Sequence, residues 1–293
     1  MGWRLYVDLV KRAAVAWVDD RAPTMGAALA FYCAFSLAPL LIIVIAVAGA
    51  VFGFDAARGA IVGQIAGLVG APAAEAIQAL LTTAQEATTG IFATVVGLVT
   101  MLVGATTILV ELQDDLDYIW KAPKRKGSSL LAILRARILS LGMILGVGLL
   151  LLISLVLSGV IAAFETYSDS YFPGAALPLL YLWNPILSVG AITVLFAMLY
   201  KWLPNVPIAW KDVWMGALIT AILFSGGRFA IGLYLGRSAI TSAYTAAGTL
   251  AVLLLWLYYS AQVFLLGAEF TCLYASHRAR SRSSEYSESD MRI

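Results

Sequence analysis

Six long apolar segments are the feature of this sequence that most constrains its fold. They cover residues 26–53, 91–113, 138–163, 179–200, 213–236 and 246–273. Each has the roughly 20 apolar residues that an α-helix needs to cross the hydrocarbon core of a bilayer. Because that core holds no water, the backbone polar groups of a spanning segment must bond to one another, as they do in a helix. The sequence therefore predicts an all-α, polytopic membrane protein with six transmembrane helices.

The composition agrees with a membrane setting and indicates how the chain is divided. Of the 293 residues, 61% are hydrophobic and 12% are charged, about half the charged share of a water-soluble domain. We expect a six-helix transmembrane domain over 26–275, preceded by an N-terminal arm over 1–25. The last part, 276–293, is rich in serine and mixed charge without aliphatic periodicity, which predicts a disordered tail. Cys33 and Cys272 lie in apolar segments and are predicted to be buried rather than bridged.

The distribution of basic residues predicts the orientation in the membrane. Sixteen of the 19 Lys and Arg residues lie in the N-terminal arm, in the connections 114–137 and 201–212, and in the tail. Lys and Arg concentrate on the cytoplasmic side of membrane proteins. Both termini are therefore predicted to be cytoplasmic, which agrees with an even number of crossings.

Residues 70–87, between the first two spans, predict an amphipathic helix on the outer face of the membrane. Pro72 lies near the expected helix start, where proline is tolerated. Apolar side chains share one face of this helix; they are Ile77, Leu80, Leu81 and Ala84. A position at the interface, or as a cap on the bundle, is favoured over a gating role.

Four stretches of the chain together resemble one protein family. They are "AALAFYCAFSLAPLLIIVIAVAGAVFG", "GATTILVELQDDLDYIW", "LYKWLPNVPIAWKDVWMGALITAILF" and "YTAAGTLAVLLLWLYYSAQVFLLGAEFT". Their content and order are similar to the YihY/virulence factor BrkB family of bacterial inner-membrane proteins, from about Trp17 to Ala275. The family usually has asparagine in an N-x-I-W motif where this chain has Asp117.

The resemblance implies a six-helix protein of the bacterial inner membrane with a transport-type role, and it implies no substrate or catalytic residues. Some family members have carried a ribonuclease label. This sequence argues against that activity, because it has one histidine, no clustered metal ligands and no basic groove with aromatic side chains on which bases could stack. We therefore expect a non-enzymatic protein without cofactor, metal or nucleic-acid partner, in contact with membrane lipids. A homo-oligomer is compatible with the sequence.

Three ionisable residues lie within or just inside the predicted spans. Arg228 is in the segment 213–236, Glu111 ends the second span and Glu269 lies near the end of the sixth. At 1.5 Å per residue, Arg228 lies about 24 Å along its helix from Asp212, towards the outer face. The two glutamates lie near the cytoplasmic ends of their helices, so we expect neither of them to pair with Arg228.

Two interpretations of Arg228 stay open. In the favoured one, the long side chain snorkels to the outer interface. In the other, Ser225, Gly226 and Gly227 loosen the helix or admit a neighbour closely, and Arg228 lines an outward-facing cavity that binds an anion or a lipid phosphate.

The acidic residues at the end of the second span are also open to two interpretations. Glu111, Asp114 and Asp115 crowd one surface, as a solvated helix end or as a cytoplasmic vestibule that attracts cations. For Glu111 and Glu269, the favoured interpretation is a helix end that reaches cytoplasmic water. If the two instead face one another across the bundle, they could share a proton.

Several residues mark places where spans could bend; they are Ser36, Pro39, Asn184, Pro185, Gly226 and Gly227. The leading hypothesis is a transporter-like protein that moves a small solute, an ion or a lipid-like molecule. The alternative is a structural, assembly or lipid-binding protein without transport activity. Transport predicts a polar interior lined by several helices, whereas scaffolding predicts a dry, packed bundle.

Overall fold

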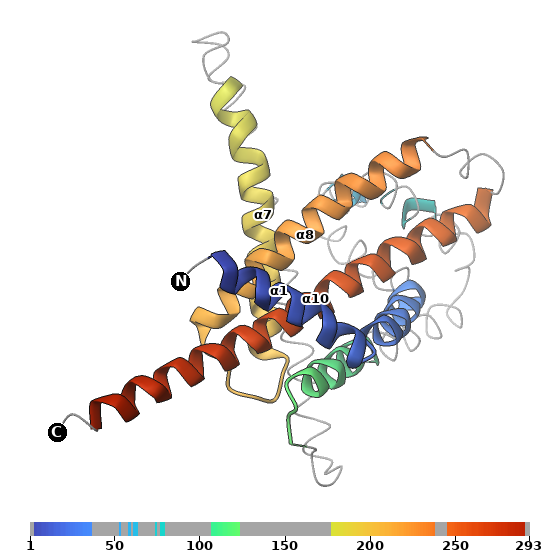
Figure 1. Cartoon of the computed structure of the whole chain (residues 1–293). Helices are drawn as coiled ribbons and strands as arrows, with labels where there is room; N and C mark the ends of the chain where they lie inside the picture. Colours follow the sequence, from blue (N-terminus) through green and yellow to red (C-terminus); the bar gives the residue numbers. More distant parts are fainter. Residues whose placement is uncertain are drawn as a thin grey trace.

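The computed structural model shows an all-helical chain, and no strand occurs in the residues it describes. Those residues are 3–36, 53, 58–59, 61–63, 74, 77–79, 107–123, 177–237 and 245–290. The labelled helices are α1 (Trp3–Asp19), α7 (Leu177–Trp202), α8 (Trp210–Arg237) and α10 (Thr245–Asp290). Two further helices cover Ala22–Ser36 and residues 107–119. The predicted all-α class is thereby confirmed for the described part of the chain (Figure 1).

Two of the described helices are long and apolar enough to cross a bilayer, and they match the last two predicted spans. These stretches are Trp210–Ile231 in α8, with 22 residues, and Leu250–Arg280 in α10, with 31. The backbone of α7 covers the predicted span 179–200. The segment 138–163 and most of 91–113 lie outside the described residues, so the number of six spans stays a prediction.

Only four residues of the amphipathic helix predicted over 70–87 are described. Ala74 and residues 77–79 are helical. Ile77, which was assigned to the apolar face, is buried, whereas Gln78 is exposed.

The N-terminal arm is a helix packed on the bundle rather than a separate polar segment. α1 buries Leu9 and Ala13 against Phe270 and Tyr274 of α10. Apolar residues at such helical spacings form one face that leaves water when the helix docks. The arm therefore belongs to the folded core, a role that its charged residues concealed in the sequence.

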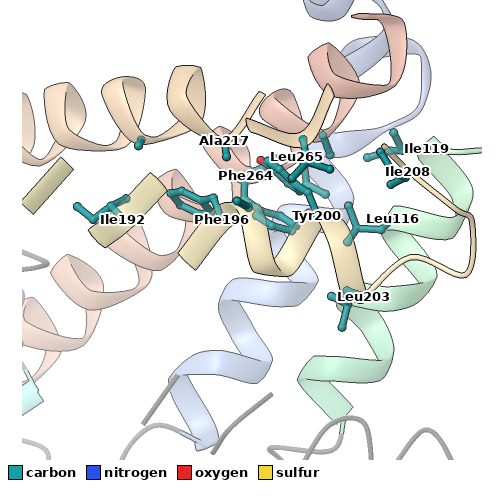
Figure 2. Packing of buried hydrophobic residues seen from close by; sticks show 14 of the residues in the cluster. Leu116, Ile119, Ile192, Phe196, Tyr200, Leu203, Ile208, Ala217, Phe264 and Leu265 are labelled. Carbon is teal, nitrogen blue, oxygen red and sulfur yellow. Dashed lines mark hydrogen bonds between the residues drawn. The ribbon is translucent and has the colours of Figure 1, made fainter. Parts of the chain in front are cut away.

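The crossing of α7, α8 and α10 holds a buried polar contact inside an apolar core (Figure 2). The hydroxyl of Tyr200, on a side chain with no exposed area, donates to the carbonyl of Phe264 at 2.7 Å and lies 3.0 Å from Oγ1 of Thr220. The rings of Tyr200 and Phe264 stack with centroids 5.1 Å apart. Two glycines bring the backbones close: Gly216 lies against Thr271, and Gly267 against Thr220 and Tyr200.

α8 and α10 run side by side over much of their length (Figure 1). Beyond the contacts of Gly216 and Gly267, Gly227 lies against the ring of Tyr259, whose hydroxyl donates to the carbonyl of Leu223 at 2.8 Å. Near the other end, Arg278 forms an ion pair with Asp212 at 3.0 Å. These contacts fix an antiparallel register of α8 against α10.

The outward face of α8 carries the side chains expected in contact with lipid. Trp214, Leu218 and Ile222 recur every four residues and are exposed. Trp202 and Trp210 are exposed as well and pack edge to face at a centroid distance of 6.1 Å. Tryptophans gather at membrane interfaces because the ring is apolar and its N–H is polar. This face therefore fits a helix that enters the bilayer near Trp210 and Trp214.

α10 continues to Asp290, whereas the composition of 276–293 predicts a disordered tail. Extending an existing helix by one residue needs no new nucleus, and arginine and glutamate are good helix formers. The helix that begins in the bundle thus extends through a segment that would not start one by itself.

The close contact of Gly267 with Thr220 and Tyr200 allows the packing of these helices to be tested by substitution. A methyl group at this position would overlap Oγ1 of Thr220 and the hydroxyl of Tyr200, both of which are buried. We expect Gly267→Ala to lower the free energy of unfolding by about 1–3 kcal/mol, measured by thermal unfolding in detergent. Gly226→Ala is the matched control, because no atom lies within 4 Å of the added methyl group. Equal stability of the two variants would contradict the close crossing.

Candidate functional site

Three segments that are distant in the sequence meet at one polar region, which we call the junction. It comprises residues 17–26, residues 115–121, and the part of α10 from Gln262 to Cys272. The amide of Gln262 donates to the carbonyl of Pro23 at 3.4 Å, and Gly26 lies against the same side chain. The thiol of Cys272 lies 3.6 Å from the carbonyl of Ile119. α10 thus holds the ends of the two other helices together.

Both of those helices end at a basic residue in the left-handed conformation. Arg21 follows α1 with φ of 57°, and Lys121 follows the helix of residues 107–119 with φ of 50°. The amides of Lys121 and Ala122 donate to the carbonyls of Tyr118 and Asp117 at 3.0 and 2.8 Å. This is a Schellman ending, in which glycine is the usual residue. The positive side chains suit the negative end of each helix dipole.

Glu269 is the acidic residue at the centre of the junction. Only 3% of its surface is exposed. The charged groups that act on it are Asp20 and Lys121. Its Oε1 atom is buried and has no hydrogen-bond partner among the described residues. A carboxylate in this position is costly unless a proton, a cation or water satisfies it.

The neighbour of Glu269 differs from the one hypothesised from the sequence. Glu111 was the suggested partner, but the charged neighbours of Glu269 are Asp20 and Lys121. Glu111 instead acts on Asp115, one turn further along its own helix. Asp20 was missed because it lies in the N-terminal arm, and nothing in the local sequence shows that α1 folds back on α10.

Four more buried polar atoms of the junction lack a hydrogen-bond partner in the described part of the chain. They are Nε1 of Trp17, Nε1 of Trp120, Oδ2 of Asp115 and Oε1 of Gln262. Most buried polar atoms in proteins are paired, and unpaired ones point to water or an ion. Buried donors and acceptors without partners therefore come from all three segments of the junction.

Asp115 is buried, whereas the favoured interpretation of the acidic cluster was a solvated helix end. Its surface is 5% exposed. Burial raises the pKa of Asp115 to about 7, and repulsion from Glu111 and Asp114 adds to the rise. Asp114 is exposed, as expected, and its pKa is raised by partial burial and by Asp117. The cluster is therefore split between a solvated face and the core.

Asp117, where the family usually has asparagine, joins two segments. Its Oδ1 atom accepts the backbone N–H of Asn205 at 2.7 Å, and its Oδ2 atom accepts the side-chain amide of the same residue. Asn205 lies in the connection between α7 and α8. The carboxylate thus ties this connection to the helix of residues 107–119.

Arg228 lies far from Glu269 along the bundle. The register of α8 on α10 places Arg228 level with Tyr259, and Glu269 between the levels of Gly216 and Thr220. The ten residues between these levels of α8 correspond to about 15 Å of helix. Arg228 is half-buried. Gly227 admits a close neighbour, as one interpretation required, whereas nothing lies within 4 Å of a methyl group added at Gly226.

The other bend candidates lie in continuous helix where they are described. The Ser36 hydroxyl donates to the carbonyl of Tyr32 at 2.9 Å, a bond that helps helices to bend. Gly226 and Gly227 lie inside α8, and Asn184 and Pro185 inside α7. Pro39 lies outside the described residues.

No group of three or more His, Cys, Asp or Glu side chains that could hold a metal ion occurs in the described ranges. Glu269 and Asp20 supply two carboxyl groups, and Cys272 makes its contact with a backbone carbonyl. The junction offers hydrogen-bonding groups and negative charge rather than a ligand cage.

In the described part of the chain, two helices long and apolar enough to cross a bilayer, exposed tryptophans and a buried acidic residue are consistent with a membrane protein. The sequence profile of the Virulence factor BrkB family matches residues 13–291. The chain belongs to this family, as its resemblance predicts.

Curated relatives carry membrane-protein names. A UPF0761 membrane protein of Ralstonia nicotianae is 30% identical over 252 residues, covering 85% of this chain and 55% of the relative. One from Azotobacter vinelandii is 30% identical over 269 residues, covering 90% of this chain and 62% of the relative. The chain thus spans little more than half the length of these relatives. No solved structure matches it.

The raised pKa of Asp115 predicts how stability depends on pH. Because the folded-state pKa of about 7 exceeds the ordinary value of 3.8, the native state binds more protons than the unfolded state between these values. The stabilising contribution of Asp115 to the free energy of unfolding is therefore complete below the ordinary pKa of 3.8. It is lost as the pH rises through the folded-state pKa of about 7. We expect Asp115→Asn to be more stable than the wild type above about pH 7, by roughly 2–4 kcal/mol.

Thermal unfolding in detergent across this pH range measures the effect. Asp114→Asn is the control, because Asp114 is exposed. Its replacement should change only slightly how steeply the free energy of unfolding depends on pH. A wild-type protein whose stability does not fall with rising pH, or an Asp115→Asn variant that keeps the slope, would contradict the assignment.

Proposed function

We propose that this protein is a non-enzymatic, transporter-like component of the bacterial inner membrane, with both termini cytoplasmic, that moves a small solute, an ion or a lipid-like molecule. The observation that supports this most is the polar interior of the junction. Of the six buried side-chain polar atoms without partners among the described residues, five come from the three segments of the junction.

The free-energy cost of these atoms argues for a use. Each buried polar atom left unpaired costs about 1–3 kcal/mol. A protein that only has to hold a shape avoids this cost with apolar side chains, as the crossing of α7 and α8 does with Phe196 and Ala217. A hydrated entry for a solute uses the same atoms, because water or the solute completes their hydrogen bonds.

The charge distribution supports a cytoplasmic location of the junction. Sixteen of the 19 basic residues lie in segments assigned to the cytoplasm, and the junction lies towards the basic ends of α10 and of the helix of residues 107–119. Measured along the bundle axis from the start of α8 at Trp210, Glu269 lies about one helical turn, or 6 Å, deeper than Trp214. An ionisable residue at such a depth in a membrane protein is a functional candidate.

One observation favours the alternative of a scaffold or lipid-binding protein. The crossing of α7, α8 and α10 is closely packed, and the buried hydroxyls of Tyr200, Thr220 and Thr271 all have hydrogen-bond partners. If the whole bundle is packed in this way, no solute can pass between these three helices.

Flux into proteoliposomes distinguishes the two functions. The purified protein is reconstituted and tested with alkali cations, small organic anions and labelled phospholipids. We expect uptake of one class above protein-free vesicles, and a loss of at least about tenfold in Glu269→Gln, which removes the central charge. Asp19→Asn is the matched control, because Asp19 is exposed and adjoins Asp20. No flux with any class, from protein that is folded and correctly inserted, would favour the scaffold.

Arg228 provides a second test in the same assay. We expect Arg228→Leu to fold and to lose most of the flux, and Arg228→Lys to restore it only in part, because lysine lacks the planar fork that grips carboxylate or phosphate. Full flux in Arg228→Leu would instead identify Arg228 as an anchor at the outer interface.

A further inference from the structure

The part of α1 that does not pack on α10 carries an apolar stripe. Leu9 and Ala13 form the buried side of this helix. Outside that side, apolar residues recur at spacings of three and four positions, which places them in one row along a helix; they are Val7, Val10, Ala14 and Val18. Val10 is 49% exposed and Val18 is 61% exposed. α1 therefore has two apolar surfaces, and the described residues bury only one of them.

Two basic residues border this stripe. Arg4 and Lys11 are both exposed and lie seven positions, or about two helical turns, apart in one row. Lys11 precedes Val18 by the same spacing, so the basic row adjoins the stripe. Beyond this row, Arg12 and Asp8 form an exposed ion pair at 2.9 Å. Around its exposed half, α1 thus changes from apolar to basic to mixed charge.

α1 lies at the depth where the membrane interface is expected. The apolar cluster that attaches it to the bundle includes Met215 of α8, which follows the exposed Trp214. Tryptophans mark the boundary between the acyl chains and water. α1 crosses α10 obliquely rather than running alongside it (Figure 1). Because α10 contains a helix of spanning length, this crossing lays α1 along the membrane surface instead of through it.

The stripe fits a lipid surface better than a protein partner. Its members are valine and alanine, whereas Trp, Tyr and Arg dominate the energetics of protein interfaces. An amphipathic helix at a membrane surface places its apolar side at the boundary between headgroups and acyl chains, and its polar side is rich in Lys and Arg. Each of these basic residues strengthens the attachment to an anionic lipid surface about fivefold. The apolar and basic rows of α1 have this arrangement.

We propose that α1 is an interfacial helix that binds anionic phospholipids. The stripe contacts the acyl chains, and Arg4 and Lys11 bind the phosphate groups of the adjoining headgroups. α1 also carries Trp17, one of the buried residues of the junction. The charge of the surrounding lipid is therefore linked to the attachment of the helix that leads into the junction, and this link requires no transport.

Hydrogen exchange of the α1 amides tests the proposal in the full-length protein. The protein is placed in nanodiscs of phosphatidylcholine alone and in nanodiscs that also contain phosphatidylglycerol, at low ionic strength. Amides of a docked helix exchange when the helix opens or detaches. We expect the α1 amides to exchange roughly twentyfold more slowly with phosphatidylglycerol, as two basic residues predict. Molar salt should remove the difference, because it screens exposed charges.

Two pairs of variants separate the basic row from the stripe. Arg4→Gln with Lys11→Gln should abolish the effect of phosphatidylglycerol, whereas Arg4→Lys with Lys11→Arg keeps both charges and should retain it. Val18→Gln should speed exchange in both kinds of nanodisc. Val15→Gln is its matched control, because Val15 is 60% exposed but lies between the basic row and Asp8, and it should change the rate less.

The proposal is overturned if the α1 amides exchange equally fast in both kinds of nanodisc, or if the glutamine pair keeps the effect of phosphatidylglycerol. It is also overturned if exchange slows only when two copies of the chain share a nanodisc, because the stripe would then bind a second copy. All four positions are exposed or border solvent on a helix that Leu9 and Ala13 hold, so the variants are expected to fold. No transported substrate takes part, and each of these failures leaves the proposed transport function standing.

Discussion

The hydrogen bond from Tyr200 to the carbonyl of Phe264 is the contact on which the described structure depends most. It lies where α7, α8 and α10 cross, and Gly267 allows the helices to approach closely enough for it to form. In surroundings that exclude water, a polar group must bond to the protein, so this contact selects one register of the helices. That register in turn decides the levels of Glu269 and Arg228, and hence that the two lie apart.

The junction differs from the crossing of α7, α8 and α10 in how its buried polar groups are satisfied. At the crossing, the buried hydroxyls have partners, whereas Trp17, Trp120 and Glu269 contribute buried atoms without partners among the described residues. Both regions use the same stretch of α10, because Phe264 and Gly267 of the crossing lie between Gln262 and Cys272.

α1 changes the interpretation of the N-terminal arm. Leu9 and Ala13 attach it to α10, and Asp20, in the turn that follows, is one of the charged groups that act on Glu269. The arm therefore contributes one of the charged groups that surround Glu269. In the sequence alone, the same residues indicate only a charged segment that precedes the first predicted span.

The sequence by itself determined the all-α class, the membrane setting, the family and the candidate role of Glu269, because long apolar segments and a buried charge within one of them have few other physical solutions. The tertiary structure alone decided the partners. Asp20 and Lys121 are the charged groups that act on Glu269, Asp117 binds Asn205, and Asp115 is buried while Asp114 is exposed. Hydropathy and helical periodicity act over one or two turns, whereas these pairings depend on how helices that are distant in the sequence cross, which close contacts at residues such as Gly216 and Gly267 settle.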